Sequence, residues 1–395
     1  MSVKQDSRLL VKAFFFLAIV DTINGFFLNK GIASPIGIIF KAFILLVACK
    51  MLSSLPKFKG LLFFTCIYIP FFLTIIILNT DSQIGVTITH LLKFVNVVFI
   101  YYAAVVIFKS ENISEKKIHT IFYLNSIVLL LNIYVGLLGI GYYAYENNLG
   151  CKGFIYAHNE MSGMQAVLFG VSYYFIYDRY ASKKMLLLLV NCFLLVAALL
   201  VATKAGILLV LLCLILVPWV HMKNGILYSF LRMSKKKLII LFSIICLISY
   251  YGYVLLDYSG AIGRWTYFFD KNGVNAIYSS RDIFWEEEKT EWEEGNLGVK
   301  LFGMGGSRTV EMDQADTLLN YGIVGIIIVY SFYFLLTVKA FRKRKINPYA
   351  YFVFGMDVFI LAASCFAGHL LFSGLMGIPF ALMNALICKQ SKIGS

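Results

Sequence analysis

The sequence predicts an all-α polytopic membrane protein with about twelve transmembrane helices and one long extracytoplasmic loop. Hydrophobic residues make up 60% of the 395-residue chain and charged residues only 14%, whereas soluble domains average about 45–50% and about 25%. Apolar runs of about 20 residues, the length that crosses a bilayer, recur along the chain. Because backbone groups in lipid must be satisfied within their own segment, such runs form helices and not open strands.

The predicted spans follow one another with short connections and one long interruption. They cover residues 10–28, 32–52, 60–78, 84–108, 118–141, 160–178, 185–202, 205–221, 238–256, 317–338, 349–366 and 369–388. The first run has basic flanks but no small-residue cleavage site after it, so we expect a retained span and not a removed signal peptide. We expect one integral membrane domain: residues 1–256 with the first nine helices, a loop over 257–316, and residues 317–395 with the last three helices and a cytoplasmic tail.

The positions of lysine and arginine predict the orientation. With the N-terminus inside, most of the chain's 35 basic residues fall on the inner side, and the short outer loops hold only Lys30, Lys152 and Lys204. The positive-inside rule then puts both termini in the cytoplasm and the 257–316 loop outside. The net charge of +14 faces the anionic inner leaflet. Nucleic acid is therefore not an implied partner.

The loop from Asp257 to Asp316 is the only long polar segment of the chain. It holds 12 of the 21 acidic residues, and a loop of this length is more often functional than passive. We read it as the floor of an extracytoplasmic active site. Its candidate substrate-binding side chains are Arg264, Arg308 and Trp285.

A short amphipathic helix is expected inside this loop. Ser279 to Asp282 form a capping box that opens it, and Gly295 ends it. Trp285 and Trp292 then share one face, so the helix would lie on the membrane or lid a cavity. Arg281 falls in the first turn, where a cation does not favour the helix dipole. An anionic ligand would explain its position.

Two lysines are further candidates for binding an anion. Lys93 lies in the fourth span, about 13 Å inside its outer boundary at 1.5 Å per residue, where a charge faces a cavity or snorkels to the head groups. Lys204 lies in a tight turn between the seventh and eighth spans. A cation beside a helix start suits phosphate, although a lysine that ends a helix by snorkelling fits the pattern equally well.

Polar side chains also precede two membrane helices. His158 and Asn159 open the sixth span, where the histidine is a candidate base or a structural donor. Glu311, Asp313 and Asp316 stand directly before the tenth span. One of these carboxylates could accept a proton from an attacking hydroxyl, while acids at a helix start also favour the dipole without any chemistry.

Taken in order, these pieces resemble the O-antigen and capsular polysaccharide polymerases (Wzy-like) and the O-antigen ligases of bacterial envelopes. The matching motifs are Gly153–Asn159, Thr203–Gly206, Ser280-Arg281-x-x-x-Trp285, Leu301-Phe302-Gly303-x-Gly305, the acidic run into Gly322-Ile323-Val324-Gly325, and Ala367-Gly368-His369.

The resemblance implies a GT-C-like glycosyltransferase of the bacterial inner membrane whose donor is a polyprenyl-diphosphate-linked oligosaccharide. Arg281 matches the family's long-loop arginine, and Lys204 stands where an arginine is commoner. Glu311 stands where the ligases carry a histidine, which favours the polymerase branch. We assign diphosphate binding to Arg281, Lys204 and Lys93, substrate binding also to His158 and Asn159, and catalysis to the three carboxylates. We expect inversion, with no metal and no cofactor.

Three other readings stay open from the sequence. An O-antigen ligase would transfer glycan to lipid A core, and a flippase would move the same lipid-linked sugar. Transporters usually show related halves and charges near the midplane, and no repeat is visible here. A structural scaffold would explain the spans but not the polar loop. A chain-length regulator and a flippase are expected partners of a polymerase.

Overall fold

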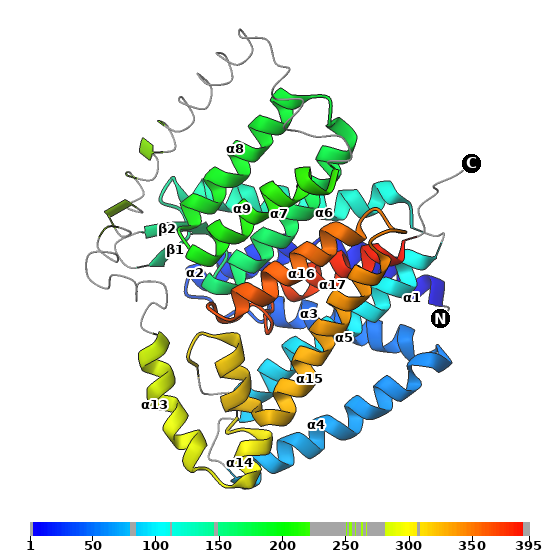
Figure 1. The fold of residues 1–395 in the computed structure, drawn as a ribbon, viewed down its shortest axis with the longest axis vertical. Coiled ribbons are helices and arrows are strands. Elements are labelled where there is room, and N and C mark those ends of the chain that lie inside the picture. Colours follow the sequence, from blue (N-terminus) through cyan, green and yellow to red (C-terminus); the bar gives the residue numbers. More distant parts are fainter. Residues whose placement is uncertain are drawn as a thin grey trace.

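The computed structural model is a bundle of helices (Figure 1). It describes residues 3–79, 84–110, 113–145, 149–221, 281–305 and 309–389, with isolated positions between 250 and 266. The elements are α1 (Val3–Phe14), α2 (Leu17–Asn29), α3 (Ile36–Ser53), η1 (Pro56–Phe58), α4 (Lys59–Asn79), α5 (Ile84–Lys109), α6 (Glu115–Gly136), β1 (Tyr142–Tyr145), β2 (Leu149–Gly153), α7 (His158–Tyr180), α8 (Lys184–Val201), α9 (Lys204–His221), α13 (Arg281–Glu294), α14 (Leu297–Phe302), α15 (Asp313–Lys343), α16 (Ala350–Ser364), α17 (Gly377–Ala385) and η3 (Leu386–Cys388).

The helices agree with a polytopic membrane protein. By length and composition, seven of the described helices could cross a bilayer, or eight if the bent pair α1 and α2 counts as one span. Helices α16 and α17 are apolar but shorter. The expected span over 238–256 lies almost wholly outside the described residues. Among the described residues the count therefore falls short of the expected twelve.

The first expected span is broken into two helices that meet at 53°. The side-chain amide of Asn125 on α6 explains the break, because it satisfies backbone groups on both sides of it. Its Nδ2 donates to the Phe14 carbonyl oxygen at 2.9 Å, and its Oδ1 accepts from the Ala18 N–H at 2.7 Å. A buried polar residue in a neighbouring helix thus replaces hydrogen bonds that a continuous helix would make for itself.

A short antiparallel hairpin of β1 and β2 precedes α7 and leaves the described part of the chain mainly helical, as expected of an all-α membrane protein. One further expectation needs correction. The last expected span, 369–388, is helical only from Gly377 onward. Backbone N–H groups of its first part bind carboxylates from other helices, as described below, so this part does not need helical hydrogen bonds.

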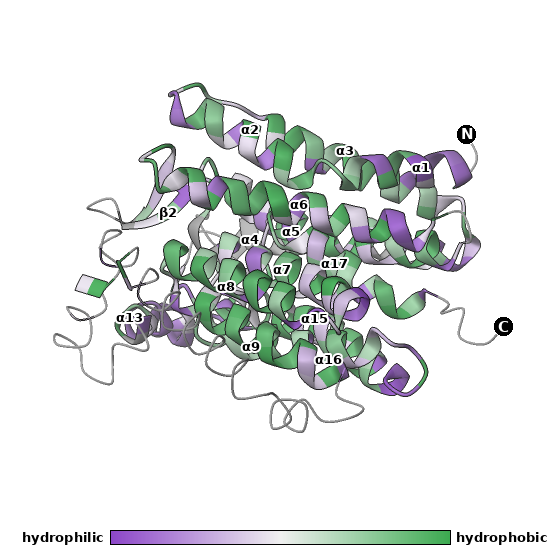
Figure 2. Ribbon diagram, turned by 90° about the horizontal axis from the view of Figure 1, so that it is seen from above, coloured by the Kyte–Doolittle hydropathy of each residue, from purple (hydrophilic) through white to green (hydrophobic). Residues whose placement is uncertain are grey.

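The chain ends lie at one end of the bundle. Figures 1 and 2 show the start of α1 and the end of α17 at this end, with the hairpin and α13 at the opposite one. Two lysines hold the C-terminal end of the described chain: the Lys343 Nζ donates to the Ile387 carbonyl oxygen, and the Lys389 Nζ donates to that of Ile113. These bonds fasten η3 and the residue after it to the end of α15 and to the segment before α6.

Two glycines lock α14 against α15. Helix α15 is interrupted at Gly322, whose φ is +63°, and a Cβ there would lie 2.4 Å from the Leu301 carbonyl carbon. A Cβ on Gly303 would lie 2.3 Å from the carbonyl carbon of Asn320. The Met304 N–H donates to the Leu319 carbonyl oxygen at 2.7 Å. These motif glycines therefore have a packing function in this fold.

Replacing Gly322 with alanine should destabilise the protein by about 1–3 kcal/mol or more, because a side chain needs both positive φ and space that the α14 backbone occupies. Thermal unfolding in detergent measures the loss. Gly85→Ala is the matched control, since nothing lies within 4 Å of a Cβ at Gly85 of α5. Equal stability of the two variants would contradict the close packing of Gly322 against the α14 backbone.

Candidate active site

Asp313, at the first turn of α15, organises the chain between α16 and α17. It is 1% exposed. Its Oδ1 accepts from the His369 N–H at 2.6 Å, and its Oδ2 accepts from the N–H groups of Leu370 and Leu371 at 2.9 and 2.8 Å. Both carboxylate oxygens are thus used by three backbone donors. Asp313 thus holds the backbone of residues 369–371 against the start of α15.

Asp316 has a similar function one turn later. Its Oδ1 accepts from the Val310 N–H, so it holds the loop that precedes α15. Its Oδ2 is buried and has no hydrogen-bond partner among the described residues. Asp313 and Asp316 together fix Val310 and the 369–371 backbone to the start of α15.

Glu311 is the carboxylate that this framework presents. Its side chain is 49% exposed. Both Glu311 and His369 have positive φ, +60° and +65°, an uncommon conformation for residues with a Cβ and one that collects at functional sites. The two segments touch closely, since a Cβ on Gly368 would lie 2.6 Å from the backbone of Glu311. Of the three expected carboxylates, Glu311 is the exposed one, because Asp313 and Asp316 are buried.

Arg281 meets Glu311 across the loop. Its Nη2 lies 3.1 Å from the Glu311 Oε2, and its Nη1 donates to the Phe366 carbonyl oxygen. The side chain is only 15% exposed, and its Nε has no partner among the described residues. Two contacts thus hold the guanidinium, a group whose planar N–H donors suit carboxylate and phosphate oxygens.

Two histidine rings meet beside Gly368, which lies against the Glu311 backbone. The rings of His90 on α5 and His369 lie edge to face, with centroids 6.3 Å apart. The charges of Arg281, Glu311, Lys93 and Glu160 all act on the His369 imidazole, and burial lowers its pKa. The ring is therefore neutral at pH 7, with one nitrogen donor and one acceptor.

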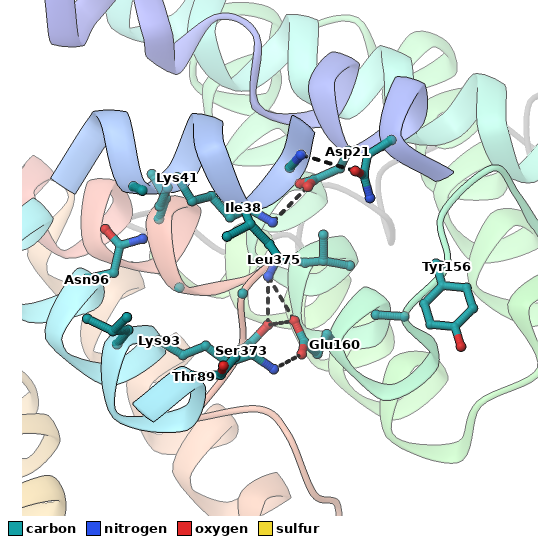
Figure 3. Close-up of a pocket in the computed structure, with 18 of the residues that line it drawn as sticks. Asp21, Ile38, Lys41, Thr89, Lys93, Asn96, Tyr156, Glu160, Ser373 and Leu375 are labelled. Carbon is teal, nitrogen blue, oxygen red and sulfur yellow. Dashed lines mark hydrogen bonds and ion pairs between the residues drawn. The ribbon is translucent and has the colours of Figure 1, made fainter. Parts of the chain in front are cut away.

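The neighbouring pocket, here called the ion-pair pocket, has a volume of about 320 Å³ and contains two ion pairs (Figure 3). The Lys93 Nζ lies 2.6 Å from the Glu160 Oε1, and the Lys41 Nζ lies 2.7 Å from the Asp21 Oδ1. The Glu160 Oε2 also accepts from the Leu375 N–H at 2.9 Å. The pairs come from four helices: α2, α3, α5 and α7.

The pocket decides between the alternatives for Lys93. Its ammonium points to a carboxylate inside the bundle, so it does not snorkel to the head groups. Because each cation is offset by an anion, the pocket is close to neutral. Unused N–H and oxygen sites of the paired groups, with Asn24, Thr89 and Asn96 at the wall, suit a ligand rich in hydroxyl groups.

Lys204 lies elsewhere. Ala202 has a φ of +59°, as the expected tight turn requires, and Thr203 forms a 2.6 Å hydrogen bond with Ser162 of α7. Lys204 is the first residue of α9 and is exposed. It does not line the ion-pair pocket. The structure therefore does not group Lys204 with Lys93.

The other expected site residues have different positions. His158 and Asn159 begin α7, as expected, but their side chains lie outside the described structure. Arg264 and Arg308 also lie outside the described residues. Trp285 packs with Trp292 against a small core formed by α14 and the start of α15. Helix α13 thus rests on protein through its tryptophan face, and Trp285 has a packing function.

Several site residues were missed from the sequence: Asp21, Lys41, Glu160, His90 and His369. The signal was present, because ionisable residues within apolar spans usually pair with one another or line a cavity. The sequence does not show which of these residues pair, because the partners, such as Lys93 and Glu160 or His90 and His369, lie far apart in the sequence. Within the described ranges, no group of three or more His, Cys, Asp or Glu side chains is arranged to hold a metal ion.

No protein-family model matches the sequence, and no curated protein matches it significantly. The function is therefore inferred from the geometry of the site.

Proposed function

We propose that the protein is a polysaccharide polymerase that joins undecaprenyl-diphosphate-linked oligosaccharide repeat units of an O-antigen, capsule or exopolysaccharide. The observation that supports it most is the accessible Glu311 carboxylate, held beside the Arg281 guanidinium on a rigid frame of buried aspartates. An accessible acid next to an anion-binding cation is the pair that transfer from a sugar diphosphate requires.

In the proposed reaction, a hydroxyl of the acceptor sugar attacks the anomeric carbon of the donor. The new carbon–oxygen bond forms as the bond to the diphosphate oxygen breaks, with inversion. Glu311 accepts the hydroxyl proton, and the polyprenyl diphosphate departs with the electron pair. Arg281 stabilises the charge that develops on it.

The ion-pair pocket is the proposed binding site for a sugar of the substrates. Its near-neutral, hydrogen-bonding wall suits a saccharide, so we assign sugar binding to Lys93 and Glu160 in place of direct diphosphate binding by Lys93. We assign the orientation of a hydroxyl to His369, whose backbone Asp313 holds and whose neighbour Gly368 lies against Glu311. We place the site at the outer face of the bacterial plasma membrane, on the basis of the positive-inside rule.

The Arg281→Ala variant tests this function in a host that lacks the chromosomal copy. A polymerase variant should leave single repeat units attached to lipid A core. Loss of all surface glycan, with long polymer on the lipid carrier, would instead indicate a ligase. Loss of glycan with lipid-linked units retained on the inner side would indicate a flippase. Unchanged chain length would exclude Arg281 from the site.

A further inference from the structure

The two ion pairs of the ion-pair pocket have cancelling charges but unequal exposure. The side chains of Lys41 and Lys93 are 21% and 24% exposed, whereas those of their partners Asp21 and Glu160 are 9% and 12% exposed. All four side chains line the cavity, and Figure 3 shows them around it. The pocket is thus neutral in sum, yet the charged side chains most accessible to a ligand are the cationic ones.

The hydrogen bonds of the pocket are unequal in the same direction. An ammonium group has three N–H donors. Among the described residues, Lys41 donates one hydrogen bond, to Asp21, so two of its donors remain. Lys93 likewise donates one, to Glu160. Glu160, by contrast, accepts from Lys93, from the Ser373 hydroxyl and from a backbone N–H. The pocket therefore has donors to spare, and a ligand with strong acceptors satisfies them.

The two lysines converge on Gly374. A Cβ at this position would lie 3.9 Å from the Lys41 Nζ, 3.7 Å from the Lys93 Cε and 3.4 Å from the Glu160 Oε2. These are ordinary van der Waals distances, so there is room for a small group over Gly374. A carboxylate in this space would lie within reach of both lysines, and charge-assisted hydrogen bonds are about twice as strong as neutral ones.

The segment that carries Gly374 also contacts the candidate active site. Within residues 369–375, the N–H groups of 369–371 bind Asp313 at the start of α15. The other end of the segment binds Glu160 in the pocket. A substituent bound over Gly374 thus lies against the same short stretch of chain that the Asp313 carboxylate holds.

We infer that the ion-pair pocket selects a sugar that carries a carboxylate, such as a hexuronic acid, and that Lys41 and Lys93 bind this carboxylate over Gly374. The inference rests on the proposed function and adds the substrate class: at least one sugar of the joined repeat units is acidic. The hydroxyl and amide side chains at the pocket wall, Thr89, Asn24 and Asn96, suit the hydroxyl groups of a pyranose ring, which a bare phosphate lacks.

Binding of methyl glycosides to the purified full-length protein in detergent tests the inference. The acidic probes are the methyl glycosides of glucuronic and galacturonic acid, and the neutral counterparts are those of glucose and galactose. Ligand-observed NMR measures the dissociation constants. The unmodified protein should bind at least one acidic probe at least about tenfold more tightly than its neutral counterpart. Added NaCl should reduce this ratio, because salt screens the charges.

Two variants assign the preference to the pocket. Asp21→Asn combined with Lys41→Gln removes one ion pair without leaving a buried charge unpaired, and Gly374→Ala places a methyl group in the space between the lysines. Each should lower the ratio to about threefold or less. Gly60→Ala on α4 is the matched control for the glycine variant, because nothing lies within 4 Å of a Cβ at Gly60. This control should keep the ratio, and thermal unfolding shows that each variant is folded.

Three outcomes would overturn the carboxylate assignment. The first is equal binding of the acidic and the neutral probe in both pairs. The second is an unchanged ratio in a folded Gly374→Ala protein or a folded double variant. The third is displacement of the acidic probe by inorganic diphosphate at lower concentrations than by the unlabelled acidic glycoside, which would make the pocket a phosphate site.

Chain length in cells separates this result from the proposed function. If Arg281→Ala stops chain extension but the unmodified protein does not discriminate between acidic and neutral probes, the carboxylate assignment fails and the polymerase stands. If the acidic preference depends on Lys41 and Gly374 while Arg281→Ala leaves chain length unchanged, the acidic sugar site stands and the polymerase assignment fails.

Discussion

Replacing Glu311 with glutamine should lower the polymerisation rate by about 10²–10⁴-fold, the usual contribution of a positioned base, with the fold intact. Glutamine keeps the size of the side chain and a hydrogen-bond acceptor for Arg281, but it cannot take up the hydroxyl proton. Because Glu311 is exposed and its partner Arg281 keeps its contact with the Phe366 carbonyl, little stability should be lost. Chain-length analysis of the product and thermal unfolding of the purified variant measure the two effects.

Asp313→Asn is the contrasting variant. The Asp313 carboxylate accepts three backbone N–H groups, and an asparagine presents an NH₂ group to at least one of them. Each buried donor left without a partner costs about 1–3 kcal/mol. This variant should therefore lose stability and activity together. An Asp313→Asn protein that is stable but inactive, next to an active Glu311→Gln protein, would transfer the catalytic assignment from Glu311 to Asp313.

Replacing Lys93 with methionine should destabilise the protein by about 3–5 kcal/mol, because it leaves the Glu160 carboxylate buried without its cation. The Lys93–Glu160 distance is 2.6 Å, and Glu160 also accepts from the Leu375 N–H and the Ser373 hydroxyl. The carboxylate cannot move to water without releasing the segment before α17. The free energy of unfolding in detergent is the measurement.

Two further variants make the Lys93 test specific. The double variant Lys93→Met with Glu160→Gln removes both charges and should recover part of the loss. Lys289→Met is the matched control, since Lys289 pairs on α13 with the exposed side chains of Glu286 and Glu293, and exposed pairs contribute about 0–1 kcal/mol. An equal loss in the free energy of unfolding for Lys289→Met and Lys93→Met would show that the Lys93–Glu160 pair stabilises the protein no more than an exposed ion pair does.

The sequence was informative wherever structure depends on neighbouring residues. The expected helix in the polar loop ends at Glu294, just before Gly295, as predicted. The turn at Ala202 is as tight as expected, and α15 begins at the predicted acidic run. Expected apolar runs coincide with helices through α9 and again in α15 and α16. Each of these features follows from hydrophobic length or from capping within a few positions.

The same local reasoning does not distinguish residues whose environment comes from distant segments. Asp313 and Glu311 look alike in the sequence, yet one is a buried acceptor for the 369–371 backbone and the other is exposed beside Arg281. The tryptophan face of α13 packs on a small core that α14 and the start of α15 form, a contact that the sequence did not indicate.

By itself, the sequence determined that this chain forms apolar helices, where most of them begin and end, and that ionisable residues interrupt several of them. Only the tertiary structure decided which of those residues meet: Lys93 with Glu160, Arg281 with Glu311, and His90 with His369. The physical reason is that helix formation depends on the composition of one segment. A pairing between helices depends on their relative rotation and depth, which packing of the whole bundle determines.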